Sequence, residues 1–177
     1  MSNARIEALA YVMFSQGGWL VCVLSAARGK GWVGTLIVAM LAVAHVYRAR
    51  APLREALLVA IISSGGWLWE CLPTALGYLR YPSGTIVSGG APYWIAGLWA
   101  LFALQINVLF TWLRDRALLA GILGGLFGPL SFRAGSALGA VQFVEPVAAV
   151  ALLGCGWAVL LPTAVWLGKK LDGVEVA

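Results

Sequence analysis

Long apolar runs, separated by short groups of charged residues, occupy nearly the whole of the 177-residue chain. Hydrophobic residues make up 62% of the sequence and charged residues 11%, and the mean hydropathy is +0.90. A soluble domain carries about 25% charged residues, so this chain has too few charges to cover a globule of its size. We therefore expect an all-α protein that lies in a bilayer as a single transmembrane domain over residues 1–177.

The apolar runs have the length of membrane-spanning helices, which need about 20 residues each. They predict a polytopic transmembrane helical bundle of about six spans. The fifth apolar stretch, residues 117–144, is too long for one crossing and contains Pro129, which can kink or end a helix. Two alternatives follow for this stretch: one kinked span, or a span with a re-entrant or interfacial tail. The expected spans are 8–26, 32–48, 52–76, 93–113, 117–135 and 146–168.

An internal repeat indicates how these spans are organised. Residues 7–20 match residues 55–68 at an offset of 48, with eight identities in fourteen positions. This offset is the length of one helical hairpin, so we expect the bundle to be built from repeated two-helix hairpins.

The distribution of basic residues predicts the orientation of the bundle. With six spans, eight Lys and Arg residues fall on the side of the termini and four on the other side. Because basic loops stay in the cytoplasm, we expect a multi-pass protein of the bacterial inner (plasma) membrane with both termini cytoplasmic.

Glu70 is the acidic residue placed deepest inside a predicted span. An intramembrane carboxyl group is costly and must be protonated, paired or wetted. Desolvation disfavours its charged form, so Glu70 is the candidate catalytic residue, as a proton donor. The alternative is a structural ion pair with Arg80 or Arg133.

A cavity that opens on the outer side is expected around Glu70, because polar and small residues recur along one face of its helix. The alternatives are an aromatic belt for the rings, an interhelical hydrogen bond for Asn107, and simple snorkelling for Arg133. The candidate ligand-binding residues are Trp67, Trp69, Tyr81, Tyr93, Asn107 and Arg133.

The sequence contains none of the motifs that mark several common kinds of catalytic or binding site. There is no nucleotide-binding loop, no metalloprotease or hydrolase motif and no Cys/His zinc pattern, so we expect no cofactor and no metal. The basic residues form no patch for a nucleic acid. His45 is the single histidine and is expected at the interface rather than in a proton relay.

Three segments together resemble an uncharacterised family of bacterial inner-membrane proteins, a domain of unknown function. They are Trp69-Glu70 with Tyr81-Pro82-Ser83-Gly84, Pro92-Tyr93-Trp94-Ile95 with Leu98-Trp99-Ala100-Leu101-Phe102-Ala103 and Asn107, and Gly128-Pro129-Leu130 with Ala134-Gly135 and Leu138-Gly139-Ala140-Val141. A His often follows the position of Asn107 in that family, whereas Val108 stands here. The resemblance implies a membrane-lipid context, because family members are encoded beside enzymes that modify unsaturated fatty acyl chains.

Three functions remain open on these grounds. The first is binding of membrane lipid, or assistance to a lipid-modifying enzyme, with membrane lipids as the expected partners. The second is a cofactor-free membrane enzyme in which Glu70 protonates an apolar lipid or polyene; this rests on analogy of fold alone. The third is a proton-coupled small-molecule transporter, suggested by the repeat and the buried acid.

Overall fold

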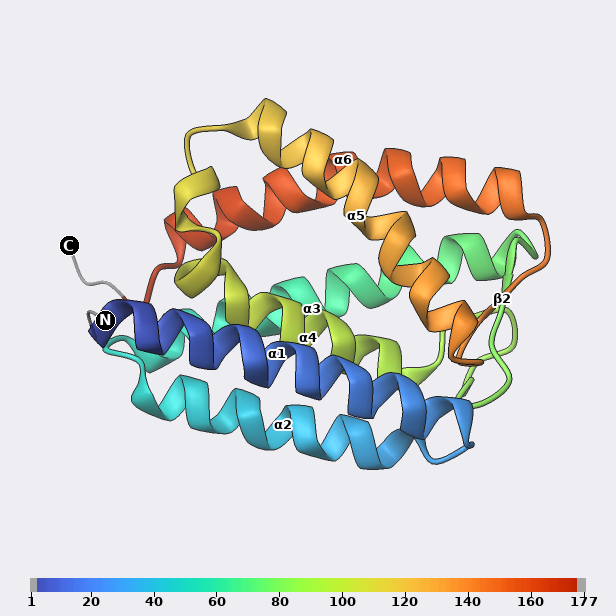
Figure 1. Ribbon diagram of the computed structural model, residues 1–177, viewed down its shortest axis with the longest axis horizontal. Coiled ribbons are helices and arrows are strands. Elements are labelled where there is room, and N and C mark those ends of the chain that lie inside the picture. The colour runs from blue at the N-terminus through green and yellow to red at the C-terminus, as the bar shows by residue number, and fades with distance from the viewer. Residues whose placement is uncertain (1–2, 175–177) are drawn as a thin grey trace.

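The computed structural model describes residues 3–174 of the chain and the side chains of residues 9–174. The described part is an all-α bundle (Figure 1), with one short 3-10 turn, η1, and two strands of two residues each. Five of its helices are long and apolar enough to cross a membrane. The elements in chain order are α1 (Asn3–Ala27), α2 (Gly31–Arg48), α3 (Pro52–Ala75), β1 (Leu79–Arg80), α4 (Tyr93–Leu109), η1 (Thr111–Leu113), α5 (Ala117–Ala137), β2 (Gln142–Phe143) and α6 (Pro146–Lys170).

Helix α4 is the shortest of the six and lies at the centre of the bundle. Its 17 residues extend about 25 Å, less than the hydrocarbon thickness of about 30 Å. Helices α1, α2, α3 and α6 all pack against it, and nine of its residues are buried. A helix that packs against four others is shielded from lipid over much of its surface, which is why it tolerates being short.

The helices pack most extensively in consecutive pairs, α1 with α2, α3 with α4, and α5 with α6. Each pair is antiparallel, so α1 begins and α6 ends at the same end of the bundle (Figure 1). This is the arrangement of helical hairpins expected from the sequence.

Helix α5 continues through Pro129 to Ala137, and the chain then passes along the end of the bundle, with Ala140 and Val141 buried there. Strand β2 pairs in antiparallel fashion with β1, opposing Leu79 to Phe143 and Arg80 to Gln142. The tail of residues 117–144 is therefore a surface strand at the end of the bundle, because its backbone partner is the loop between α3 and α4. The re-entrant alternative is wrong for this segment.

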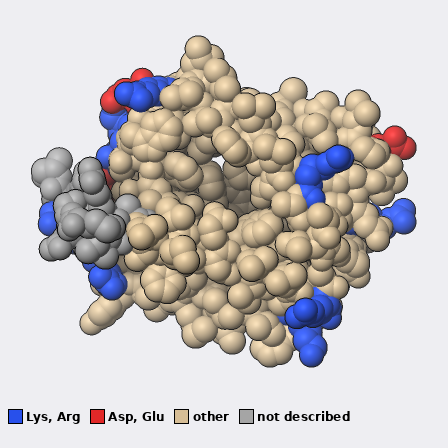
Figure 2. All heavy atoms as spheres, viewed as in Figure 1, with Lys and Arg blue, Asp and Glu red and all other residues tan. Residues whose placement is uncertain are grey.

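Charged side chains lie toward the two ends of the face shown in Figure 2 and leave its centre uncharged. Large hydrophobic side chains such as Met13, Val43 and Phe127 are exposed between those ends. An apolar belt of this kind fits a multi-pass membrane protein, in which lipid covers the belt.

Glycines allow α5 and α6 to approach each other closely. A Cβ atom on Gly124 would lie 2.2 Å from the backbone oxygen of Trp157, and a Cβ atom on Gly128 would lie 2.2 Å from the Trp157 ring. The glycines of α5 therefore form a packing seam against α6, as expected from their spacing.

Candidate functional site

A cavity of about 730 Å³ lies between α1, α4, α5 and α6. This volume is in the range of small-molecule sites, about 300–1,000 Å³. Its lining residues are Ser15, Gln16, Trp19, Ile95, Leu98, Trp99, Leu101, Phe102, Gln105, Phe110, Trp112, Leu113, Leu123, Gly124, Phe127, Gly128, Leu130, Ser131, Phe132, Ala134, Trp157 and Leu161.

The cavity opens through the side of the bundle. Helices α1 and α5 hardly contact each other, whereas each packs closely on another helix. The face seen in Figure 2, in the same view as Figure 1, is hollowed near its centre, between α5 on one side and α1 with α4 on the other. Because the helices lie across this view, the opening faces sideways, within the uncharged belt.

The cavity wall is mainly aromatic and aliphatic and includes no Asp, Glu, Lys or Arg among the described residues. The rings of Trp99 and Trp157 are stacked, with centroids 4.6 Å apart, and Phe102 meets each of them edge-on. Such a wall offers apolar contact and no charge, so it suits a hydrocarbon chain rather than an ion.

Four neutral polar side chains interrupt this wall, those of Ser15, Gln16, Gln105 and Ser131. Ser15 is 5% exposed, and Nε2 of Gln105 donates a hydrogen bond to the carbonyl oxygen of Leu101 at 3.1 Å. The wall can therefore form hydrogen bonds at a few fixed points.

A second, small pocket of about 30 Å³ extends toward Tyr81. It shares Trp19, Ile95, Leu98, Ser131 and Phe132 with the large cavity, so the two spaces adjoin. Tyr81 is the one predicted site residue that lines either of these two spaces.

Glu70 is fully buried within α3, and neither of its carboxyl oxygens has a hydrogen-bond partner in the structure. The alternative interpretation of Glu70, an ion pair with Arg80 or Arg133, is wrong: the ion pairs among the described residues are His45–Glu55, Arg114–Asp172 and Lys169–Asp115. Both arginines are exposed at the end of the bundle, where water and lipid headgroups can solvate them. A buried acid cannot reach a cation that stays at the surface.

Two of the predicted residues, Trp67 and Trp69, lie in α3 near Glu70 and make contacts within the protein. Nε1 of Trp67 donates to the carbonyl oxygen of Ala91 at 3.1 Å, and the amide of Ala91 donates to Sγ of Cys71 at 3.3 Å. Trp69 packs on Gly156 of α6, where a Cβ atom would lie 1.9 Å from its ring. These contacts give Trp67 and Trp69 packing roles, and ligand binding by them stays a prediction.

Tyr81 lies in the same loop and interacts electrostatically with Glu70. Its hydroxyl group is buried without a hydrogen-bond partner, and its ring meets Trp94 edge-on at 5.6 Å. Burial, with a smaller effect from nearby Glu70 and Cys71, raises the pKa of Tyr81 well above its ordinary value. Tyr81 and Glu70 are thus two buried acidic groups, neither with a hydrogen-bond partner.

Two other predicted residues lie near that end of the bundle. Tyr93 is half-buried at the start of α4, and its amide donates to the carbonyl oxygen of Gly84 at 3.0 Å. Arg133 is exposed, with its guanidinium carbon 5.7 Å from the centroid of the Phe143 ring. Whether either side chain contacts a ligand stays a prediction.

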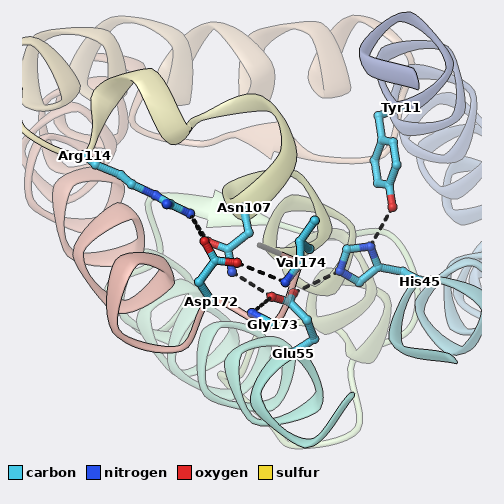
Figure 3. A network of polar contacts seen from close by, with 8 residues as sticks. All are labelled: Tyr11, His45, Glu55, Asn107, Arg114, Asp172, Gly173 and Val174. Atoms are coloured by element: carbon cyan, nitrogen blue, oxygen red, sulfur yellow. Dashed lines mark hydrogen bonds and ion pairs between the residues drawn. The ribbon is translucent and has the colours of Figure 1, made fainter. Parts of the chain in front are cut away.

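Asn107 lies apart from the other predicted residues, in a second buried polar cluster centred on Glu55 (Figure 3). Oε1 of Glu55 accepts hydrogen bonds from Nδ2 of Asn107 at 2.7 Å and from the amide of Gly173 at 2.8 Å. Nε2 of His45 lies 2.9 Å from the other oxygen, and Nδ1 of His45 lies 2.8 Å from the Tyr11 hydroxyl. Asn107 therefore makes the interhelical hydrogen bond that was the alternative to ligand binding.

The cluster continues into the C-terminal segment. Arg114 donates to Asn107 at 3.0 Å and to Asp172 at 2.6 Å, and the amide of Val174 donates to Asp172 at 2.9 Å. Glu55 has three polar partners, so this buried carboxylate is satisfied, unlike Glu70. His45 is buried in the cluster rather than lying at the interface, because Glu55 and Tyr11 occupy both of its ring nitrogens.

Sequence reasoning missed Glu55 because a glutamate in the first turn of a helix ordinarily faces water and favours the helix dipole. Its partners are 10, 52 and 118 residues away along the chain. The available signal was the repeat, which begins with Glu7 and Glu55 in equivalent positions.

Comparison with known proteins places the chain in one family. A family model described as "Protein of unknown function (DUF2878)" matches residues 7–163, which is most of the chain. No curated protein and no solved structure matches it.

Proposed function

We propose that this chain, which belongs to the DUF2878 family of unknown function, binds the hydrocarbon part of a membrane lipid in the cavity between α1, α4, α5 and α6. The observation that carries the proposal is the sideways opening of an uncharged, aromatic-lined cavity within the apolar belt (Figure 2). A lipid chain could enter from the bilayer without crossing water, so its apolar surface would never be exposed.

The proposal differs in place from the cavity expected around Glu70. Of the residues predicted from sequence, Tyr81 alone adjoins the cavity, through the small second pocket. We retain a bacterial inner-membrane location, with both termini in the cytoplasm, as part of the proposal. A lipid-modifying enzyme remains the second proposed partner, because a protein that holds a lipid sideways in the bilayer could present it to such an enzyme.

A second candidate is the cofactor-free acid catalyst. The observation that favours it is the unpartnered carboxyl group of Glu70 beside the unpartnered hydroxyl of Tyr81, next to the pocket that adjoins the cavity. A transporter has less support, because Leu58, Ile62 and Gly66, with Trp99 packed on it, fill the face of α3 between Glu55 and Glu70. That apolar packing leaves no chain of polar groups to carry a proton between the two acids.

Lipid extraction tests the proposal. The protein is purified in a mild detergent, and the lipids that remain bound are extracted and identified by mass spectrometry. We expect a defined lipid class at close to one molecule per chain. In the variant Ser131→Trp, an indole ring placed on the cavity wall should lower that amount at least about fivefold, since one misplaced methylene group already costs about 1–3 kcal/mol in a filled apolar site.

The matched control is Ser64→Trp, the same change at an exposed position on α3 that does not line the cavity. It should retain the bound lipid. Equal lipid content in both variants, or a bound population that mirrors the bulk membrane, would count against the cavity as the binding site.

A further inference from the structure

We infer that the lipid bound in the cavity carries an uncharged oxygen group, such as an alcohol or carbonyl, that is bound between Ser15 and Gln105. This inference rests on the proposed function and names the class of ligand. It concerns a polar point on the wall of the large cavity, whose lining residues do not include Glu70 or Tyr81.

Ser15 and Gln105 lie at the same level of the bundle. Sγ of Cys22 lies 3.8 Å from the carbonyl oxygen of Trp94, and a Cβ atom on Gly18 would lie 3.2 Å from the side chain of Leu101. Helices α1 and α4 therefore run antiparallel in contact. About one further turn along each helix leads from Gly18 to Ser15 and from Leu101 to Gln105, so the two residues lie at a similar level of these helices. Both residues line the cavity.

Ser15 is 5% exposed, and its hydroxyl forms no hydrogen bond within the described residues. Its oxygen is not among the fully buried atoms that lack a partner, so it is accessible from the cavity that Ser15 lines. Two serines of α3 instead bond within the protein: Ser63 donates to the carbonyl oxygen of Ala96 at 2.7 Å, and Ser64 donates to that of Ala60 at 2.6 Å. A hydroxyl that faces the cavity without a partner in the protein is available to donate to, or accept from, a group of the ligand.

Gln105 supplies the complementary group. Its Nε2 atom is held by the carbonyl oxygen of Leu101, which fixes the amide and leaves Oε1 as an acceptor. A ligand hydroxyl can donate a hydrogen bond to Oε1 of Gln105 and accept one from the Ser15 hydroxyl. A ligand carbonyl can accept a hydrogen bond from the Ser15 hydroxyl only.

The charge of the ligand follows from the rest of the wall. No acidic or basic residue among the described ones lines the cavity, so a carboxylate, phosphate or ammonium group placed there would lose its hydration without gaining a counter-ion. The group between Ser15 and Gln105 is therefore neutral.

Competition between chains of equal length tests this inference. The probe is 9,10-dibromooctadecane, whose bromine atoms quench tryptophan fluorescence, and Trp99 and Trp157 line the cavity. Octadecan-1-ol, octadecane and octadecylammonium are then added at equal mole fractions in the detergent micelle. We expect the alcohol to displace the probe at about a three- to tenfold lower mole fraction than the alkane, as one or two neutral hydrogen bonds allow. The ammonium compound should displace it least.

The double variant Ser15→Ala, Gln105→Leu should remove the preference for the alcohol and keep binding of the probe, whereas Ser64→Ala should leave both unchanged. Equal displacement by alcohol and alkane in the unaltered protein, or a preference that persists in the double variant, would overturn the inference and leave the proposed function intact. Quenching of the unaltered protein that an excess of octadecane does not reverse would instead overturn the proposed function.

Discussion

Glu55 and Glu70 are both fully buried in the same helix, but their surroundings differ in kind. Glu55 accepts hydrogen bonds from Asn107 and Gly173 and has His45 at its other oxygen, whereas Glu70 has no polar partner. Removing one member of a satisfied buried cluster leaves the others unpaired, while removing an unpartnered group leaves nothing behind.

We therefore expect Glu55→Leu to lower the free energy of unfolding by about 3–5 kcal/mol, because the amide of Asn107 and the backbone N–H of Gly173 would lose their acceptor. Urea or SDS titration of the purified protein in detergent measures this. Ser64→Leu, at an exposed position of the same helix, serves as the control and should change the unfolding free energy by less than about 0.5 kcal/mol. A loss as small as that of the control would show that the cluster does not stabilise the fold.

Glu70→Leu should leave the free energy of unfolding unchanged or raise it, since burying an apolar group there avoids the cost of an unpartnered acid. The same titration gives the answer, and a loss above about 2 kcal/mol would show that Glu70 has a structural partner. If Glu70 serves as an acid catalyst, this variant loses its activity and keeps its stability, which separates the two roles.

Glu70 and Glu55 were predictable from the sequence to different degrees. Glu70 could be found because a charge inside an apolar run is a local signal in the sequence. The role of Glu55 depends on residues brought together by the packing of α2, α3, α4 and the C-terminal segment, and no spacing within α3 encodes them.

At the scale of elements, adjacent glycines in α3 have opposite surroundings. A Cβ atom on Gly65 would meet no atom within 4 Å, whereas one on Gly66 would lie 1.9 Å from the ring of Trp99 in α4. Gly66 is therefore required for the approach of α4, and Gly65 is not.

Alanine substitution at the two positions tests this contrast. Gly65→Ala should raise the free energy of unfolding by about 0.5–1 kcal/mol, because alanine is the better helix former. Gly66→Ala should lower it by about 1–3 kcal/mol through overpacking against Trp99. Thermal unfolding in detergent distinguishes them, and equal effects at both sites would contradict the close packing of α3 on α4.

The elements themselves were largely predictable from the sequence. The lengths of the apolar runs and the charged residues between them predicted the helix ends to within a few residues. Pro52 is the first residue of α3, and Pro146 is the first residue of α6. The end of the fourth run was less clear: α4 stops at Leu109 and a 3-10 turn follows, although residues 93–113 contain no charged residue that would mark the end of the helix. Hydropathy shows that a segment avoids water but not where its backbone stops being helical.

At the scale of the whole molecule, the number of crossings fixes the side of each terminus. In the structure α1 begins and α6 ends at the same end of the bundle, which requires α4 to cross despite its 17 residues. We expect fluorescent-protein fusions at the N-terminus and the C-terminus both to fluoresce in the cytoplasm, and alkaline phosphatase fusions after residue 85 to be active. Opposite sides for the two termini would mean five crossings.

The position of the cavity could not be predicted from the sequence. The helical face around Glu70 looked suited to a cavity, but Trp67 and Trp69 fill the space beside it with packing contacts. The observed cavity exists because α1 and α5 diverge, and the separation of two helices is set by all the helices that pack on them.

The hairpin of α5 and α6 is fastened to the rest of the protein at both ends. Strand β2 holds it to β1 at one end, and Gly173 bonds to Ala51 and Glu55 at the other. The opening beside α5 is therefore bordered by helices that are held at both ends, and we expect it to keep a fixed width. A molecule that exchanges through this opening moves only in the plane of the bilayer. Its rate of exchange therefore depends on its mole fraction among the surrounding lipids and not on its concentration in water.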